Sequence, residues 1–454
     1  MSRYALHLND AGLTLLDEQR IVYREPGFAW LGDERLATGN EAFAHARIDP
    51  RRIQHRYWSE IGTEPLRDSR FRHLTAADIA ATQLEQIRDK AGAIGELVVA
   101  VPSYLDAAAL GLFLGIAEDL KIPVVAMVDA AVAATRREYR NAVPVHVDIG
   151  LHRTTLVRLA QPGHAQVDRV EVVDNAGTYA LFDAWMTAVA EAFVMQSRFD
   201  PLHTAETEQT LLDRLGGWLR EAAAAETVQM SITSAGTNYE AAIDSLALTD
   251  AAAPVYQQIA TRLRTLFRAE DRPALQVTDR VSRLPGLTEM LKVRVGGEVF
   301  VLEAGATARG ALARCRGARA AGQAVSLLKQ LPWDQTAIDF GADEVRTPQA
   351  GVPTHLLFGH VAYAIGNSPL VLGSEQTDGE RGILLEADMP GVSRRHCSVL
   401  KKNGQCVLQD LSRYGTFLNG HRIEGSTVLQ AGDAIRVGTP GFEFRLITTD
   451  EGNG

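Results

Sequence analysis

The chain has 454 residues, of which 46% are hydrophobic and 22% charged, and its formal net charge is −10. This length exceeds what one ordinary hydrophobic core organises, so we expect roughly two to four compact units. The excess of negative charge argues against a broad nucleic-acid-binding surface. Apolar residues nowhere run on for the roughly eighteen positions that a membrane span needs, so we expect no membrane insertion.

The cysteines and the first residues indicate a cytoplasmic protein. Only Cys315, Cys397 and Cys406 occur, an odd number without the spacing of metal ligands. This pattern predicts neither a disulfide framework nor a metal site, and a reducing compartment fits it best. The opening stretch MSRYALHLND lacks the apolar segment of a secretory signal. The alanine- and arginine-rich composition favours a bacterial, GC-rich genome.

Two groups of short alternating segments suggest an internal duplication. YALHLND, GLTLLDE and QRIVYRE lie within residues 4–25, and VPVHVDIG, RTTLVRLAQ and QVDRVEVVD lie within residues 143–174. Each trio predicts a β-meander, because short strands are separated by polar or glycine turns. Two meanders, each followed by helical patterns, predict a duplicated α/β lobe.

The segment between the meanders alternates strand and helix patterns. LVVAVP and IPVVAMV are buried-type strands, and the helical stretches at residues 106–120 and 129–139 follow them, capped by Asp106 and Asp129. This succession predicts a parallel strand pair joined by a crossover helix.

Three blocks in this order resemble the nucleotide-binding domain of the actin and 70-kDa heat-shock chaperone superfamily. They are VPSYLDAAALGLFLGIAEDLKIPVVAMVDAAVAA, VHVDIGLHRTTLVRL, and LQVTDRVSRLPGLTEML followed by EVFVLEAGATARGAL. The resemblance covers roughly residues 1–318 and implies a two-lobed, duplicated ribonuclease-H-like body at residues 1–320. The lobes of that fold flank a nucleotide cleft.

The nucleotide loops depart from the family's pattern. Active members carry an Asp and a Gly in the first phosphate loop, where this chain has His7 and Asn9, although a shifted alignment uses Asp10 and Gly12 instead. The second loop keeps Asp148 and Gly150, but its later positions are bulky or lack the expected carboxylate: Leu151, His152, Arg153 and Thr155. Side chains here would occupy the space that phosphates need.

The adenosine loop differs in the same way. Asp279-Arg280 replaces the family's Gly-Gly pair, while Ser282 and Arg283 persist. Asp129 either replaces the family's connecting-helix glutamate or serves only as a helix N-cap, and we favour the cap. Three altered loops together predict a pseudo-ATPase without catalytic residues or cofactor. Bound ATP with magnesium is the disfavoured alternative.

The last hundred residues predict an all-β sandwich of short strands after a helix and linker at residues 321–352. LVLGS, GVSRRHCSV and LQDLSRYGTFLNG resemble the forkhead-associated (FHA) domain. We assign this domain to residues 353–449 and a tail to residues 450–454. The heat-shock chaperones carry a substrate-binding domain at this position, so peptide refolding is not expected.

The resemblance implies capture of phosphothreonine by loops. It places Ser393 at the phosphate, and the cations Arg394, Arg395 and Arg413 would complete the site by charge-assisted hydrogen bonds. The residues expected to hold the loops are Gly373, His396, Gly415, Thr416 and Asn419. Two positions differ from the FHA pattern. Ser374 replaces the family's loop arginine, and Tyr414 replaces the asparagine that holds the peptide.

We therefore expect a non-catalytic adaptor that binds a protein partner, threonine-phosphorylated or unmodified, and that can also self-associate. An active or ATP-gated ATPase switch is the second hypothesis, and a filament-forming protein is the third. The sequence gives little support for a serine or cysteine hydrolase.

Overall fold

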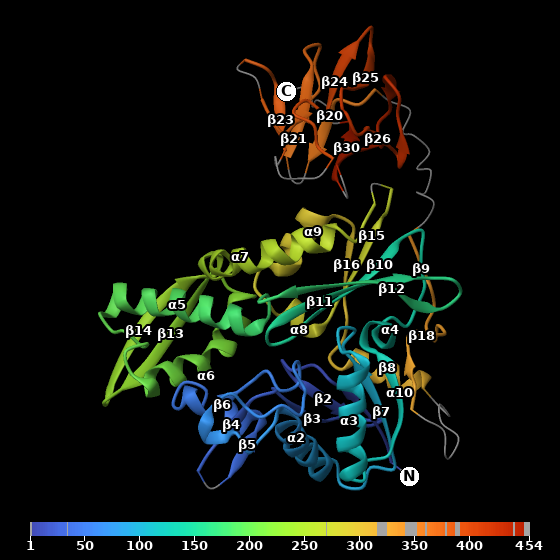
Figure 1. The fold of residues 1–454 in the computed structure, drawn as a ribbon. Helices are drawn as coiled ribbons and strands as arrows, with labels where there is room; N and C mark the ends of the chain where they lie inside the picture. Colours follow the sequence, from blue (N-terminus) through green and yellow to red (C-terminus); the bar gives the residue numbers. More distant parts are fainter. Residues whose placement is uncertain are drawn as a thin grey trace.

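The computed structural model describes residues 2–33, 35–268, 270–315, 325–340, 352–358, 361–376, 379–385, 391–438 and 441–448. Helices and strands mix up to about residue 340, and the described elements after that point are strands (Figure 1). None of the helices within these ranges is long and apolar enough to cross a membrane.

The first sheet has six strands. In spatial order they are β17 (Leu327–Leu328), β8 (Val124–Asp129), β7 (Glu96–Val101), β1 (Arg3–His7), β2 (Leu13–Leu16) and β3 (Ile21–Glu25). β1 pairs with β2, and β2 with β3, in antiparallel register, whereas β7 runs parallel to both β1 and β8. The first predicted meander and the predicted parallel pair are both confirmed.

The second sheet repeats this arrangement. Its order is β16 (Glu298–Val301), β15 (Pro273–Val277), β10 (Val143–Ile149), β11 (Arg153–Ala160), β12 (Ala165–Asp174) and β18 (Gln330–Leu331). Again the first meander strand, β10, pairs antiparallel with the next strand and parallel with a strand from much later in the chain. The second meander is thus confirmed. Five strands of each sheet follow one order, β8-β7-β1-β2-β3 and β16-β15-β10-β11-β12, whereas β17 and β18 extend opposite edges.

Helices cover both sheets because the central strands are largely apolar and are buried on both faces. These helices are α2 (Ala76–Ala91), α3 (Ala107–Asp119), α4 (Ala130–Ala134), α5 (Thr178–Ser197), α6 (Ala205–Ala222), α7 (Ser245–Arg264), α8 (Asp279–Ser282), α9 (Leu287–Val295) and α10 (Ala306–Arg314). As predicted, Asp106 caps α3 by accepting a hydrogen bond from the amide of Ala109.

The helix predicted for residues 129–139 is much shorter than expected. α4 ends at Ala134, and Thr135 already has an extended backbone. The chain then enters β9 (Tyr139–Arg140), which pairs with β19 (Ile338–Asp339). Arg136 also turns outward to form a bidentate ion pair with Asp334. Contacts with a distant segment therefore override the local helical pattern.

The helix predicted within residues 321–335 is wrong where the structure describes the chain. β17 extends the first sheet beside β8, and β18 extends the second sheet beside β12. A sheet edge offers unpaired amide and carbonyl groups, and these short strands satisfy them. Residues 316–324 and 341–351, including most of the expected linker, lie outside the described residues.

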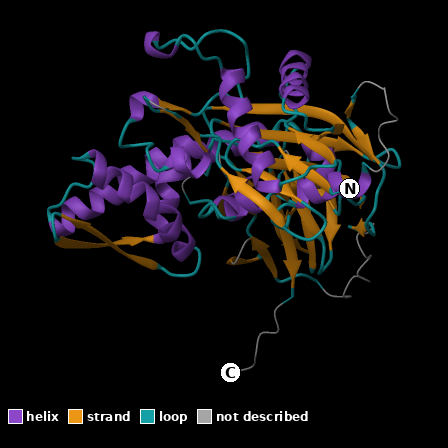
Figure 2. Ribbon diagram, turned by 90° about the horizontal axis from the view of Figure 1, so that it is seen from below, coloured by secondary structure: helices purple, strands orange, loops and turns teal. Residues whose placement is uncertain are grey.

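Smaller elements enlarge the body on one side. β5 (Leu36–Thr38), β4 (Ala29–Leu31) and β6 (Ile53–Gln54) form a small sheet with α1 (Gly39–Phe43) and the 3-10 turns Pro50–Arg52 and Ser69–Phe71. The hairpin β13 (Thr227–Ser234) and β14 (Thr237–Asp244) packs on α5 and α6 (Figure 2).

The C-terminal unit is a two-sheet β structure, as predicted. One sheet contains β21 (Val361–Ala364), β20 (His355–Phe358), β30 (Phe442–Ile447), β29 (Ala434–Val437), β26 (Phe417–Leu418) and β27 (His421–Arg422). The other contains β23 (Gly382–Leu384), β22 (Leu370–Gly373), β24 (Cys397–Lys402), β25 (Gln405–Asp410) and β28 (Ser426–Leu429). Alternate residues of β30, Phe442, Phe444 and Leu446, are buried in the shared core, whereas Glu443 and Arg445 are exposed.

Candidate functional site

Three loops of the C-terminal sandwich meet at one place. Backbone hydrogen bonds join the loop after β22 to the loop before β24, from the amide of Ser374 to the carbonyl of Ser393 (3.2 Å) and from the amide of Glu375 to the carbonyl of Arg394 (3.1 Å). The loop after β25 joins them through the amide of Leu411, which donates to the carbonyl of His396 (2.9 Å). The sequence motifs that we singled out therefore lie next to one another.

Ser393 lies at the centre of this arrangement. Its hydroxyl oxygen accepts a hydrogen bond from the amide of Arg413 (3.1 Å), and its own amide donates to Nδ1 of His396 (3.1 Å). His396 is fully buried, and its Nε2 donates to the carbonyl of Gly415 (3.1 Å). Burial lowers the pKa of His396, which keeps the ring neutral with one donor and one acceptor nitrogen. His396 thus holds two loops together.

The other expected structural positions have specific contacts. A Cβ on Gly373 would lie 2.0 Å from the carbonyl oxygen of Arg394, so only glycine lets the two loops approach. Gly415 has a φ of +98°, and its amide donates to the Ser412 hydroxyl. Thr416 donates to the carboxylate of Asp410 (2.7 Å).

Asn419 shapes the turn after β26. Its φ is +50°, a left-handed conformation that asparagine adopts more readily than most residues. Its side-chain oxygen accepts from the amide of Ala434 (2.9 Å), and its side-chain nitrogen donates to Asp433 (2.8 Å). Asn419 therefore fastens this turn to the start of β29 rather than facing the three loops.

The cations around Ser393 are mostly exposed. Arg394 lies 3.4 Å from Glu375, with its side chain 85% exposed, and Arg395 lies 2.7 Å from Glu380. Arg413 is exposed, and no ion pair involves it within the described residues. Arg381, a further arginine near these loops in the sequence, donates to the backbone carbonyl of Ala364. Tyr414 is 60% exposed.

The comparisons with known proteins agree with this geometry. Residues 371–438 match the FHA domain family. The C-terminal sandwich is an FHA domain. No curated protein matches the chain. An FHA domain is a phosphoprotein-binding interaction module, so this part of the chain serves protein–protein interaction.

Sequence reasoning missed several residues of the FHA loops. Asp410 accepts hydrogen bonds from both Thr416 and the amide of Ser412, so it supports the loop that carries Arg413. Glu375 and Glu380, which pair with the two arginines, were also missed. Their position within GSEQTDGER, directly after the altered Ser374, was the available signal.

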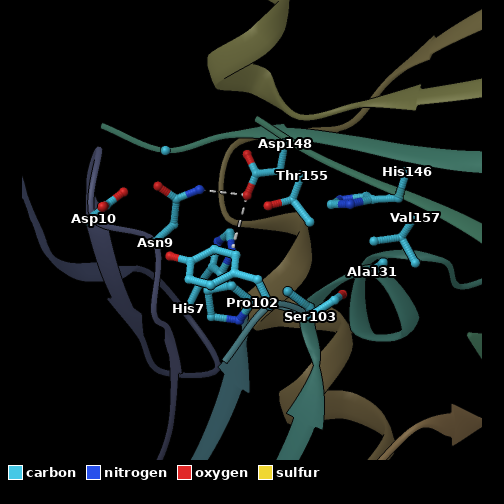
Figure 3. A pocket seen from close by; sticks show the side chains of 13 residues that line it. His7, Asn9, Asp10, Pro102, Ser103, Ala131, His146, Asp148, Thr155 and Val157 are labelled. Atoms are coloured by element: carbon cyan, nitrogen blue, oxygen red, sulfur yellow. Dashed lines mark hydrogen bonds and ion pairs between the residues drawn. The ribbon is translucent and has the colours of Figure 1, made fainter. Parts of the chain in front are cut away.

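The second candidate site lies in the α/β body around Asp148 (Figure 3). Asn9 donates to Oδ2 of Asp148 (2.7 Å), Thr278 donates to Oδ1 (2.8 Å), and Nε2 of His7 lies 3.4 Å from Oδ2. Asn9, His7 and Asp148 therefore converge. These contacts use both oxygens of the carboxylate.

Arg280 closes one side of this cluster. Its guanidinium lies 3.1 Å from Oδ1 of Asp148 and donates to the carbonyl of Gly12 (3.0 Å). Both charged side chains are nearly buried, at 12% and 8% exposure. Burial alone would raise the pKa of Asp148, but Arg280 and His7 hold it well below its ordinary value. The carboxylate is therefore an ion already paired by the protein.

The first two loops also touch directly. Oδ1 of Asp10 accepts from the amide of Leu151 (2.7 Å), and a Cβ on Gly150 would lie 2.5 Å from that oxygen. The pocket lined by Asp10, Asp148 and their neighbours has a cavity volume of about 20 Å³. That space suits about one water molecule.

Thr155 lies beside Asp148 in the same pocket (Figure 3), whereas other predicted residues of the body have contacts elsewhere. Asp129 caps α4 by accepting from the amides of Ala131 (2.9 Å) and Val132 (3.3 Å). Arg283 pairs with Asp279, and Ser282 donates to the backbone of the same residue. Arg153 lies over the ring of Tyr104, 4.7 Å from its centroid. Among the described residues, no group of three His, Cys, Asp or Glu side chains could hold a metal ion.

Proposed function

We propose that this chain is a non-catalytic adaptor whose FHA domain binds a threonine-phosphorylated segment of a partner protein. The observation that carries the proposal is the position of Ser393 beside Arg413. The backbone amide of Arg413 donates to the Ser393 hydroxyl, so the serine lies beside a loop that carries an exposed arginine. A hydroxyl and a guanidinium together offer a neutral and a charged donor to one phosphate. Arg394, on the same loop, can supply a second guanidinium once it turns from Glu375.

The supports of the Ser393 loop favour this function. His396 and Asp410 are tied to the loops through buried or partly buried hydrogen bonds, so the phosphate donors are held before a ligand arrives. A site that is ordered in advance loses less conformational entropy on binding. The loss of the family's arginine at Ser374 leaves Arg413 as the leading candidate for the phosphate cation.

Binding of a phosphothreonine peptide library to the full chain tests this function. We expect the selected phosphopeptides to bind at least about tenfold more tightly than the same peptides without phosphate, because charge-assisted hydrogen bonds to phosphate are strong. Ser393→Ala and Arg413→Ala should each remove most of that difference. Arg445→Ala, which removes an exposed arginine on β30, serves as the matched control. Equal binding of phosphorylated and plain peptides to the wild-type chain would contradict the proposal.

We further propose that the body is an actin-like fold that has lost nucleotide binding. The shared strand order of the two sheets supports the duplicated, two-lobed architecture. Arg280, from the loop that resembles the adenosine loop, reaches across to Asp148 and Gly12 and takes space near both phosphate loops. The body would then act as a scaffold for a partner or for a second copy of the chain.

A further inference from the structure

The FHA loops carry acidic side chains where the ligand's phosphate is expected. Glu375 follows Ser374 in the loop after β22, and Glu380 lies at the end of the same loop. Glu375 pairs with Arg394 and Glu380 with Arg395. Two of the four arginines around Ser393 are thus matched by carboxylates of the protein itself.

The backbone holds these pairs in place. The amide of Glu375 donates to the carbonyl of Arg394 (3.1 Å), so their side chains leave adjacent points of two joined loops. Gln376 donates to the carbonyl of Glu380 (2.9 Å), which closes the loop between the two glutamates. Glu380 is the less exposed partner, at 28%, against 63% for Glu375.

The charge balance at Ser393 is unusual for a phosphate site. A bound phosphothreonine brings about −1.5 to −2 charges at neutral pH. Ser374 supplies no charge where the family has arginine, Arg381 is turned to Ala364, and Glu375 adds a negative charge beside Arg394. The two positive charges of Arg394 and Arg413 are then set against the charge of Glu375 and that of an incoming phosphate, which leaves the site short of positive charge.

We propose that the partner segment carries a lysine or arginine next to its phosphothreonine, and that this cation pairs with Glu375 when the phosphate takes Arg394. The exchange keeps every charge at the site paired. This inference rests on the proposed phosphothreonine binding and defines the class of ligand that the site selects. Glu380, paired with Arg395, provides a second carboxylate for a basic residue on the other side of the phosphothreonine.

The alternative is that the exposed arginines favour acidic segments around the phosphothreonine. Four arginines, Arg381, Arg394, Arg395 and Arg413, lie on these loops, and a simple count of cations predicts that preference. The two hypotheses predict opposite orders of affinity, so one set of peptides separates them.

The test uses the full chain and three phosphothreonine peptides that differ only beside the phosphothreonine, with lysine, alanine or glutamate on both sides. We expect the lysine peptide to bind about 1.5- to fivefold more tightly than the alanine peptide, the range typical of one exposed ion pair. The glutamate peptide should bind most weakly. Glu375→Gln should abolish the preference for lysine and tighten binding of the alanine peptide, because it removes a negative charge from the phosphate site.

Glu443→Gln is the matched control, because Glu443 also forms an exposed ion pair with an arginine but lies on β30. It should leave the order of the three peptides unchanged. Phosphate-dependent binding with equal or reversed affinities for the lysine and glutamate peptides would overturn this inference and leave the proposed function intact. Loss of all phosphate dependence, measured with the unphosphorylated lysine peptide, would instead overturn both.

Discussion

The contact between Arg280 and Asp148 joins two residues 132 positions apart in the sequence. In the proposed actin-like alignment, Asp148 is the carboxylate that the second loop keeps, and Arg280 lies where the family has a glycine. In this molecule the arginine neutralises the aspartate, which already accepts hydrogen bonds from Asn9 and Thr278. Asp148 is thus part of a nearly buried ion pair.

Arg280→Ala should strongly destabilise the body. Removal of one partner from a buried ion pair leaves an uncompensated charge and typically costs about 3–5 kcal/mol in the free energy of unfolding. Denaturation in urea at pH 7 measures this loss. Arg283→Ala, which removes an arginine that is 55% exposed and paired with Asp279, should cost less than about 1 kcal/mol.

The same variant has a defined pH dependence. The wild-type Asp148 has a depressed pKa, so its stabilising contribution is present above the unfolded value of about 3.9 and is lost as the pH falls below it. Without Arg280, less favourable charge interaction offsets the cost of burying the ionised Asp148 carboxylate. Protonation of Asp148 removes that charge and so lowers the cost. The loss of unfolding free energy in Arg280→Ala, relative to the wild type, should therefore be smaller at pH 4 than at pH 7. An equal loss at both pH values would argue against charge as its cause.

At the scale of elements, the small sheet near the N-terminus packs on helices that come much later. Phe28 and Ile53 belong to the same hydrophobic cluster as Leu181 and Trp185 of α5. Arg47 pairs with Asp183 of α5 and with Glu208 of α6. These contacts join the part of the chain around the first sheet to the part around the second.

Two histidines, His55 and His152, also lie where the small N-terminal sheet packs against α5. Nδ1 of His55 lies 2.8 Å from Nε2 of His152, and both rings lie against Tyr179 of α5. One nitrogen must donate and the other accept, so at least one ring is neutral. Burial lowers the pKa of His55 to about 4 and that of His152 to about 3, with Arg56 adding to both effects.

This pair predicts acid sensitivity. The folded pKa values lie below the unfolded value of about 6.5, so the stabilising contribution is full above that pH and is lost as the pH falls toward about 4. Between pH 7 and pH 5 we expect the free energy of unfolding to fall by roughly 1 kcal/mol per histidine, after allowance for partial exposure. The unfolding free energy of the double variant His55→Gln, His152→Gln should fall less than that of the wild type between pH 7 and pH 5. His421→Gln, at an exposed position of β27, should behave as the wild type.

At the scale of the whole molecule, residues 325–340 link the two sheets of the body. β17 and β18 are separated by one residue, yet they extend different sheets. Arg314, whose side chain is 3% exposed, donates to the carbonyls of Thr135 (2.9 Å) and Val132 (2.9 Å) and lies near Asp334 of this segment. The end of the body is thereby fastened to both sheets before the chain continues toward the FHA domain.

The proposed loss of nucleotide binding is tested on the full chain by thermal unfolding. Ligand at a hundred times its dissociation constant stabilises the folded state by about 2.7 kcal/mol, so a site of about 10 μM affinity would raise the melting temperature by several degrees at 1 mM. We expect ATP with magnesium to leave the melting temperature unchanged. A magnesium-dependent rise together with ATP turnover would restore the ATP-gated switch in place of the scaffold.

Much of the fold was predictable from local patterns. Alternating apolar residues predicted both meanders, the apolar runs predicted the parallel strands β7 and β8, and the spacing of the C-terminal motifs predicted the FHA domain. The predicted helices at residues 129–139 and 321–335 failed because Arg136 pairs with Asp334 and because short strands complete the sheet edges. Those partners are distant in sequence, and periodicity carries no information about them.

The amino-acid sequence by itself determined the periodicity of the strands, the residue types in the altered loops and the order of the FHA motifs, because these depend on neighbours along the chain. Only the tertiary structure decided which charges meet: Arg280 with Asp148 in the body, and Glu375 and Glu380 with Arg394 and Arg395 in the FHA domain. The physical reason is that an ion pair depends on the distance between two side chains, and the folded backbone alone sets that distance.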